Sequence, residues 1–426
     1  MNVMRLTCWV GRLLALVGVI ATPLGAQTLE PEQVVAWRED LVSFEQSLRK
    51  RHIDLFHQLP ESDFNNRVRQ LRDRLPNISE VGILRELMCL TAAIGDGHTQ
   101  VNYWGRTHRN LPLRWRWFED GLRVVKTSSA YGHLLGARLQ RIGGLTEMAL
   151  SAALTGCLPS VENVHSARAA YARAASVAEV LAGAGVAVAD AGVEVEVELA
   201  SGKLVSLTLP WQQAGEDLAV APSWETYGFQ PISPSVPGLS TYLRSDTATA
   251  YLQFDHYPPY GEARAWAEAL NASLAEHKVR RVIIDLRNNG GGDFFVGLVL
   301  AHGLVLLDQL DWRQGVYVLI GRHTYSAAMS NAAQYRQILN ARLVGEPTGA
   351  NPVGYQDADS FRLPNAGWQV MVSKRRYRFT DHATPGLQPD VPVAWPADAY
   401  FAGRDVPLEW ILRDIDVLVH AAAENP

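Results

Sequence analysis

Between residues 249 and 345 the chain alternates short runs of β-branched and aliphatic residues with longer segments of helical periodicity. The runs "TAYLQFDH", "VRRVIIDLR", "GVYVLIG" and "ARLVGE" predict strands, and helices are predicted between them. Strands that alternate with helices form a mainly parallel sheet, which binds its ligands at the carboxyl ends of the strands. We therefore predict an α/β fold whose functional residues lie at that edge of the sheet.

Two of these predicted strands end in loops that could form a catalytic site. Asn288 and Asn289 lead into three glycines after one strand, and Ser326 opens a predicted helix after another. Glycines expose backbone N–H groups, so the N–H groups of Gly291 and Ala327 are predicted to form an oxyanion hole beside the serine hydroxyl. The structural alternatives are a plain glycine turn and a serine that only caps its helix.

The first residues, 1–26, are typical of a secretory signal peptide. Arg5 and Arg12 precede an apolar run, which is followed by a proline and small residues. The apolar run is roughly half of the ~20 residues that a membrane-spanning helix needs. We therefore predict an exported chain with no stable membrane insertion after the signal peptide is cleaved.

Three further segments are predicted after the signal peptide. Residues 27–105 have helical periodicity, and Ser79 is the predicted N-cap of the third helix there. Residues 106–221 contain short strands and an alanine-rich helical stretch, which predicts a β-rich middle domain. Residues 222–426 form the α/β core, and its first part, 222–242, is rich in proline and serine and is predicted to be a connection.

The composition restricts the partners and cofactors of the chain. Charged residues make up 19% and the net charge is -5, so no basic excess indicates nucleic acid or an anionic membrane surface. The chain has no HExxH motif and no cysteine pair at metal-ligand spacing, which excludes a thiolate zinc site. In an exported chain Cys89 and Cys157 can form a disulfide or remain two free thiols, and the sequence leaves both possibilities open.

Four linked motifs resemble one known family of enzymes. "IIDLRNNGGGD", "TYSAAMSN", "ARLVGEPTG" and "GLQPDVPV" are similar, in this order, to motifs of the C-terminal processing (tail-specific) serine peptidases, over about residues 248–400. The resemblance implies a crotonase-like core, endoproteolysis of exported or misfolded proteins, and no cofactor or metal. It also implies a PDZ-like module around "LLGARLQRIGGL" in the middle domain.

The resemblance also suggests which residues act in catalysis. Family members with a Ser/Lys dyad carry a lysine after the "GEPTG"-like strand, where this chain reads "GANPVGY" and has no lysine before Lys374. The branch that includes the tricorn core protease uses histidine, and His98 in "GDGHTQ" matches its motif. Histidine suits the role of base because its pKa lies near working pH. Ser326 is therefore the predicted nucleophile and His98 the base, oriented by Asp381 or, alternatively, by Glu346.

These observations together predict a secreted or periplasmic serine endopeptidase that acts on proteins or peptides through an acyl-enzyme. An acyl-CoA enzyme of the crotonase type is a second possibility, but coenzyme A is cytoplasmic and the predicted signal peptide argues against it. A third is a catalytically inactive relative that binds peptides or apolar ligands.

Overall fold

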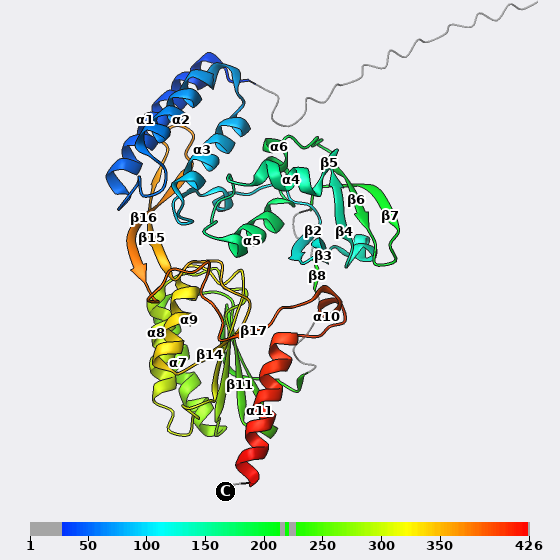
Figure 1. Cartoon of the computed structure of the whole chain (residues 1–426), viewed down its shortest axis with the longest axis vertical. Coiled ribbons are helices and arrows are strands. Elements are labelled where there is room, and N and C mark those ends of the chain that lie inside the picture. Colours follow the sequence, from blue (N-terminus) through cyan, green and yellow to red (C-terminus); the bar gives the residue numbers. More distant parts are fainter. Residues whose placement is uncertain (1–27, 214–217, 221–226, 425–426) are drawn as a thin grey trace, which may run out of the picture.

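The computed structural model describes residues 28–213, 218–220 and 227–424. The predicted signal peptide, residues 1–26, lies outside these ranges. Within them the chain is a mixed α/β protein with N-terminal helices, a middle sheet and a C-terminal sheet (Figure 1). No helix in the described ranges is both long and apolar enough to cross a membrane.

The N-terminal segment is helical, as its periodicity predicted. Its elements are α1 (Pro31–Arg51), α2 (Glu61–Arg74), the 3₁₀ turn η1 (Leu75–Asn77) and α3 (Glu80–Ile94). The predicted cap is confirmed, because the Ser79 hydroxyl accepts a hydrogen bond from the N–H of Gly82 at 3.2 Å. Ile83, Leu87 and Ile94 form the buried face of α3. α3 ends at Gly95, whose left-handed φ of 90° suits glycine.

The middle section contains an antiparallel sheet in the order β2-β3-β4-β6-β7, to which β5 and β8 are attached. Its strands are β2 (Leu113–Phe118), β3 (Gly121–Thr127), β4 (Arg138–Ile142), β5 (Leu145–Thr146), β6 (Val193–Glu198), β7 (Leu204–Leu209) and β8 (Ala219–Val220). Its helices and 3₁₀ turns are η2 (Tyr103–Gly105), η3 (Ser129–Leu134), α4 (Glu147–Leu154), α5 (Val164–Ala174) and α6 (Ala178–Gly183). The strictly alternating "VEVEVE" forms one strand of the hairpin that it predicted.

The C-terminal sheet has the order β17-β14-β13-β12-β11-β10-β9, and β11 to β14 and β17 run parallel. Its elements, with one short turn, are β9 (Gln230–Val236), β10 (Leu239–Arg244), η5 (Ser245–Thr247), β11 (Thr249–Phe254), β12 (Arg281–Asp285), β13 (Val316–Ile320), β14 (Arg342–Gly345) and β17 (Val391–Pro392). The predicted connection at 222–242 is wrong where β9 and β10 extend this sheet. Pro231 and Pro234 of β9 are tolerated because β9 is an edge strand.

Helices cover both faces of this sheet (Figure 1). They are α7 (Tyr260–Glu276), α8 (Phe294–Val305) and α9 (Ala327–Ile338) on one face and α11 (Val406–Glu424) on the other, with the short α10 (Ala397–Phe401) leading into α11. Trp266 of α7 and Met329 of α9 are buried against one face, and Leu408 and Ile411 of α11 against the other. Both faces are therefore buried, as continuous hydrophobic strands require.

A long hairpin crosses from this sheet to the N-terminal helices. It consists of β15 (Val353–Arg362) and β16 (Gln369–Arg378), and β16 pairs with the short strand β1 (Gln100–Val101). Leu363, Trp368 and Val370 join the same hydrophobic core as α1 to α3 and the middle sheet. The sequence placed residues 222–426 in one α/β core, whereas this hairpin packs with the N-terminal part of the chain because its apolar side chains face that core.

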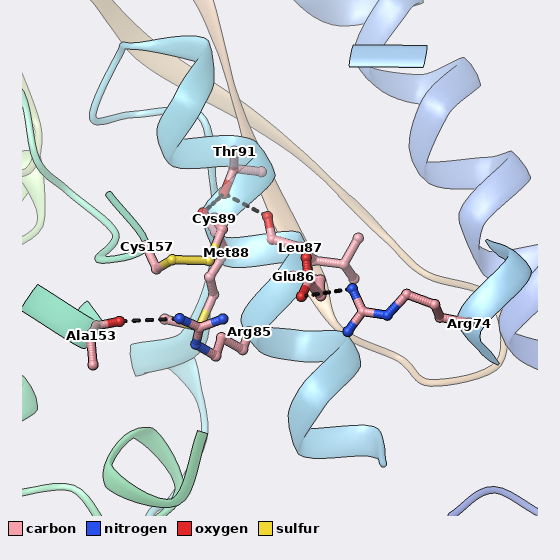
Figure 2. The surroundings of a disulfide bond; sticks show 9 residues. All are labelled: Arg74, Arg85, Glu86, Leu87, Met88, Cys89, Thr91, Ala153 and Cys157. Atoms are coloured by element: carbon pink, nitrogen blue, oxygen red, sulfur yellow. Dashed lines mark hydrogen bonds and ion pairs between the residues drawn. A yellow bond between two sulfur atoms is a disulfide. The ribbon is translucent and has the colours of Figure 1, made fainter. Parts of the chain in front are cut away.

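A disulfide joins Cys89 of α3 to Cys157 in the loop after α4 (Figure 2). The structure thus decides between the two possibilities that the sequence left open. The bond connects the helix that leads to His98 with the segment that leads to α5.

Candidate active site

Ser326 occupies a sharp turn between β13 and α9. Its φ of 51° and ψ of −126° lie in a region that non-glycine residues rarely adopt. Among the described residues its hydroxyl caps no N–H group of α9, so the serine is not an ordinary helix cap. Strained backbone of this kind clusters at functional sites.

The glycine loop after β12 lies directly against this turn. A Cβ atom on Gly291 would lie 2.6 Å from Cβ of Ser326 and 3.1 Å from the backbone nitrogen of Ala327, so only glycine fits. The N–H of Tyr325 donates to the carbonyl of Asn289 at 3.1 Å and holds the two loops together. The glycines therefore allow a close approach of two backbones, which explains why a buried strand ends in so bare a loop.

The two predicted oxyanion donors differ in this arrangement. The N–H of Ala327 opens α9, where the first N–H groups have no partner within the helix. The N–H of Gly291 instead donates to Oδ1 of Asn289 at 2.9 Å. The assignment of Gly291 as a free donor is therefore corrected: the Asn289 side chain forms a local turn that engages this N–H group.

His98 lies in a tight turn that Asp96 organises at the end of α3. Oδ1 of Asp96 accepts hydrogen bonds from the N–H groups of His98 at 3.1 Å and Thr99 at 2.7 Å, and Oδ2 lies 2.8 Å from Nε2 of His52. Burial acts to raise the pKa of Asp96, but the hydrogen bonds of His52 and Ser373 outweigh it and lower this pKa below its usual value. The buried carboxylate thus fixes the backbone that carries His98.

The imidazole of His98 is held between Glu162 and Tyr325. Nδ1 lies 3.1 Å from Oε1 of Glu162, and the ring stacks on Tyr325 with 5.1 Å between the centroids. A side chain on Gly97 would collide with the Tyr325 hydroxyl, so this glycine lets the turn approach. Nε2 of His98 is buried and has no hydrogen-bond partner among the described residues. Tyr325 directly precedes Ser326, so the fold brings His98 into contact with the residue before this serine.

Glu162 connects three segments of the site. Its Oε1 also accepts a hydrogen bond from the Tyr325 hydroxyl at 2.7 Å, and its Oε2 accepts one from the N–H of Asn351 at 2.8 Å. Burial and the Glu162 carboxylate raise the pKa of Tyr325 far above its usual value, so this phenol stays protonated and donates. No sequence pattern indicates Glu162, because it lies in a loop between α4 and α5 without a recognisable motif.

The two carboxylates that the sequence favoured lie elsewhere. Asp381 is exposed, and its main-chain carbonyl accepts a hydrogen bond from Arg378. Glu346 forms ion pairs with Arg322 and Arg116. The expectation that Asp381 or Glu346 lies at the imidazole is therefore corrected, because the fold places the Glu162 carboxylate there. Lys374, the first lysine after the "GEPTG" motif, is exposed and pairs with Asp357 at 3.5 Å.

Buried ion pairs hold the segment that leads into the glycine loop. The Arg287 side chain contacts Asp285 and Asp405, each at 2.7 Å. A polar cavity of about 570 Å³ adjoins these residues at the carboxyl ends of the strands. Neither Ser326 nor His98 lines this cavity, which lies beside the candidate centre.

One known protein family matches part of the chain. Residues 301–393 match the model for peptidase family S41. The matched segment includes Ser326 but neither His98 nor Glu162. No curated protein sequence matches the chain. The match confirms the predicted resemblance and identifies the class of enzyme, a serine peptidase, for which the substrates are proteins or peptides.

Solved structures of similar fold include mature CPAF in complex with lactacystin. It is 13% identical, the alignment covers 92% of this chain and 99% of that chain, and the TM-score is 0.61. The photosystem II D1 C-terminal processing protease is 16% identical over 88% of this chain and 96% of its own, with a TM-score of 0.42. The tricorn protease is 13% identical over 90% of this chain and 37% of its own, with a TM-score of 0.40. At this sequence identity the likeness to CPAF establishes a shared fold alone.

Proposed function

We propose that this protein is an exported serine endopeptidase that hydrolyses peptide bonds through an acyl-enzyme. Ser326 is the nucleophile, His98 is the base, and Glu162 orients the imidazole. The core, residues 222–426 without the β15–β16 hairpin, is crotonase-like. The mechanism is that of the histidine branch of the family, in which no cofactor takes part.

The tautomer of the His98 ring is the main support for this proposal. A carboxylate can only accept hydrogen bonds, so the Nδ1 atom beside Glu162 must carry the proton. Nε2 is then the atom with the free lone pair, and it is the buried ring atom that has no partner among the described residues. A base oriented by a carboxylate beside a serine in a strained turn is the arrangement that nucleophilic catalysis requires.

The reaction follows from these positions. Oγ of Ser326 attacks the carbonyl carbon of the scissile bond while its proton passes to Nε2 of His98. The C–N bond then breaks, and the imidazolium gives this proton to the leaving amine. A water molecule attacks the acyl-enzyme and gives a proton to His98, which returns it to Ser326 as the product carboxylate leaves.

The N–H of Ala327 stabilises the oxyanion of each tetrahedral intermediate. It lies on the residue after the nucleophile and at the positive end of α9, and both features favour negative charge there. Gly291 contributes by having no side chain rather than by donating a hydrogen bond.

The disulfide supports the location that we propose. Disulfides persist in oxidising compartments, so the Cys89–Cys157 bond agrees with a secreted or periplasmic enzyme. After cleavage of the signal peptide the protein has no stable membrane insertion, and it binds no nucleic acid. The middle domain, residues 106–221, is PDZ-like and captures an extended substrate segment by strand addition.

Cleavage of an unfolded protein tests this function. The wild type should cleave reduced and alkylated casein, and Ser326→Ala should lower the rate by about three orders of magnitude or more. Ser240→Ala on β10 is the matched control and should cleave at the wild-type rate. A Ser326→Ala variant that cleaves as fast as the wild type contradicts the assignment. A folded wild type that binds casein without cleaving it favours the inactive peptide-binding alternative.

A further inference from the structure

The segment between β14 and β15 contacts the loop that carries Glu162. Asn351 lies in this segment, and its backbone N–H group donates a hydrogen bond to Oε2 of Glu162 at 2.8 Å. Its side chain makes a second contact with the same residue, because Nδ2 donates to the main-chain carbonyl of Glu162 at 3.1 Å. Asn351 therefore holds Glu162 at both its carboxylate and its backbone.

The oxygen of the Asn351 side chain fixes the orientation of the amide group. Oδ1 accepts hydrogen bonds from Nδ2 of Asn163 at 2.8 Å and from the N–H of Gly386 at 2.9 Å. An amide whose oxygen faces two donors and whose nitrogen faces a carbonyl can adopt only one of its two flipped orientations. Asn351 thus joins the loop before α5 to the loop before β17.

Asn163, the residue directly after Glu162, contributes to the same contact. Its Oδ1 atom caps α5 by accepting hydrogen bonds from two N–H groups of the first turn, at 2.8 Å and 3.1 Å. Its Nδ2 atom donates to the carbonyl of Gly349 at 2.9 Å as well as to Asn351. The backbone on either side of the Glu162–Asn163 peptide bond is therefore bound to the segment between β14 and β15.

The position of the Glu162 carboxylate determines whether it can orient His98. Oε1 of Glu162 lies 3.1 Å from Nδ1 of His98, close to the long end of the range for such hydrogen bonds. A carboxylate that moved away by about 0.5 Å would lie outside this range. The side chains of His98 and Glu162 are only 9% and 4% exposed, so bulk water has little access to replace a lost contact.

We propose that Asn351 is a positioning residue of the peptidase centre: it holds Glu162, and through Glu162 it orients the imidazole of His98. This inference rests on the function proposed above. It gives a role to the segment "GANPVGY", which has no lysine but supplies the asparagine that holds the orienting carboxylate. Asn351 acts through Glu162 and not on the substrate.

A double-mutant cycle in kcat tests this role. Asn351→Ala should lower kcat on a fluorogenic peptide about 10–100-fold, because a misplaced group slows the chemical step. KM should stay within about twofold of the wild-type value. In the Glu162→Gln background Asn351→Ala should lower kcat by less than about twofold, since the carboxylate that Asn351 positions is absent. Asn365→Ala is the matched control, an exposed asparagine whose side chain contacts Asp40, and it should have the wild-type kcat.

Low-field proton NMR at low temperature tests the inference without any cleavage. The Nδ1 proton of His98, bonded to a carboxylate, should give a low-field resonance that is absent in His98→Ala. His52 should give a second resonance, because its Nδ1 accepts a backbone N–H at 2.9 Å and its Nε2 therefore donates to Asp96 at 2.8 Å. Asn351→Ala should remove or broaden the His98 resonance and keep the His52 resonance, which reports an intact fold. Asn365→Ala should keep both.

Asn351→Asp is a more conservative second variant. It keeps the acceptor for Asn163 and Gly386, but a carboxylate oxygen replaces the donor to the Glu162 carbonyl. This variant should also lose the His98 resonance and keep that of His52.

These experiments separate the inference from the proposed function. If the wild type cleaves no peptide but both Asn351 variants lose the His98 resonance alone, the proposed function fails and the positioning of the imidazole stands. If Asn351→Ala keeps the His98 resonance and the wild-type kcat, the inference fails whether or not Ser326 is the nucleophile. An equal loss of kcat in the wild-type and Glu162→Gln backgrounds, or loss of both histidine resonances in both variants, would show a general effect on the fold and would also overturn it.

Discussion

At the scale of single residues, the proposed site depends on Glu162, because this side chain connects His98 to Tyr325 in the serine turn. Its carboxylate contacts the His98 ring and the Tyr325 hydroxyl, and Tyr325 is covalently joined to Ser326, the proposed nucleophile. Loss of the carboxylate would leave the imidazole free to adopt the wrong tautomer. In serine peptidases such a change costs far more activity than stability.

Glu162→Gln should therefore lower the rate of peptide cleavage by about 10²–10⁴-fold. Gln keeps the shape of the side chain and can still accept a hydrogen bond from Asn351. Asp381→Asn is the matched control and should cleave at the wild-type rate, because Asp381 is exposed. Initial rates on one fluorogenic peptide at saturating concentration measure both variants. Loss of activity in Asp381→Asn with normal activity in Glu162→Gln would restore the sequence-based assignment.

Local patterns in the sequence indicate Ser326 and His98 as candidates but do not indicate the residues that contact them. A strand, a serine and a helix follow one another along the chain, and two glycines flank Asp96 just before His98, so both residues carry a local signal. Glu162 carries none, since only the folding of distant segments brings it to the imidazole. The sequence also does not predict the hydrogen bond of the Gly291 N–H group, because this bond depends on the rotamer of Asn289.

At the scale of elements, α3 positions His98, the proposed base. Ser79 caps its first turn, Gly95 ends it, and the Asp96 turn that carries His98 follows at once. The disulfide ties this helix to the loop that leads to Glu162 (Figure 2). The disulfide thus joins the segment just before His98 to the segment just before Glu162.

Reduction of this disulfide should destabilise the fold and lower the activity. The bond closes a loop with a sequence separation of 68 residues, for which chain entropy gives about 4 kcal/mol of stabilisation. Urea unfolding of the wild type with and without dithiothreitol measures this difference. A Cys89→Ala/Cys157→Ala variant should have the same free energy of unfolding as the reduced wild type, and dithiothreitol should not change it. An equal response of both proteins would show that the disulfide is not the cause.

The Asp96 turn predicts a dependence of stability on pH. The folded pKa of Asp96 is lowered, so its contribution is fully present above the unfolded pKa, about 3.9, and is lost as the pH falls through the folded value. Asp96→Asn should cost about 1–3 kcal/mol at pH 6 and progressively less below pH 4. Urea unfolding of both proteins at pH 6, 4 and 3 measures this. A difference that grows as the pH falls would contradict the lowered pKa.

At the scale of the whole molecule, the β15–β16 hairpin connects the peptidase sheet to the N-terminal helices. Its sequence lies between two family motifs, which is why residues 353–378 were assigned to the α/β core. Alternation alone predicts that such strands have one buried face, but it does not say which distant core buries it. The alternation of strands and helices in the main sheet is predictable, because the strands β11 to β14 pair with one another in the order of the chain.

Leu363→Ala should therefore destabilise the N-terminal part of the molecule. Leu363 is 1% exposed within the core shared with α1 to α3, and its truncation should cost about 2–5 kcal/mol. Hydrogen exchange should become faster in α1 to α3, although the substitution lies far from them in sequence. Leu286→Ala at the end of β12 is the matched control and should act on the main sheet instead. Faster exchange confined to that sheet in Leu363→Ala would contradict the shared core.

The measurement that most directly tests the whole arrangement is the rate at which a fluorophosphonate labels the protein. Only an activated serine reacts, and mass spectrometry locates the label. We expect one label on Ser326, whose formation is abolished in His98→Ala and nearly unchanged in Lys374→Ala. A label on a different serine, or labelling that survives in His98→Ala but is lost in Lys374→Ala, would contradict a catalytic centre of Ser326, His98 and Glu162.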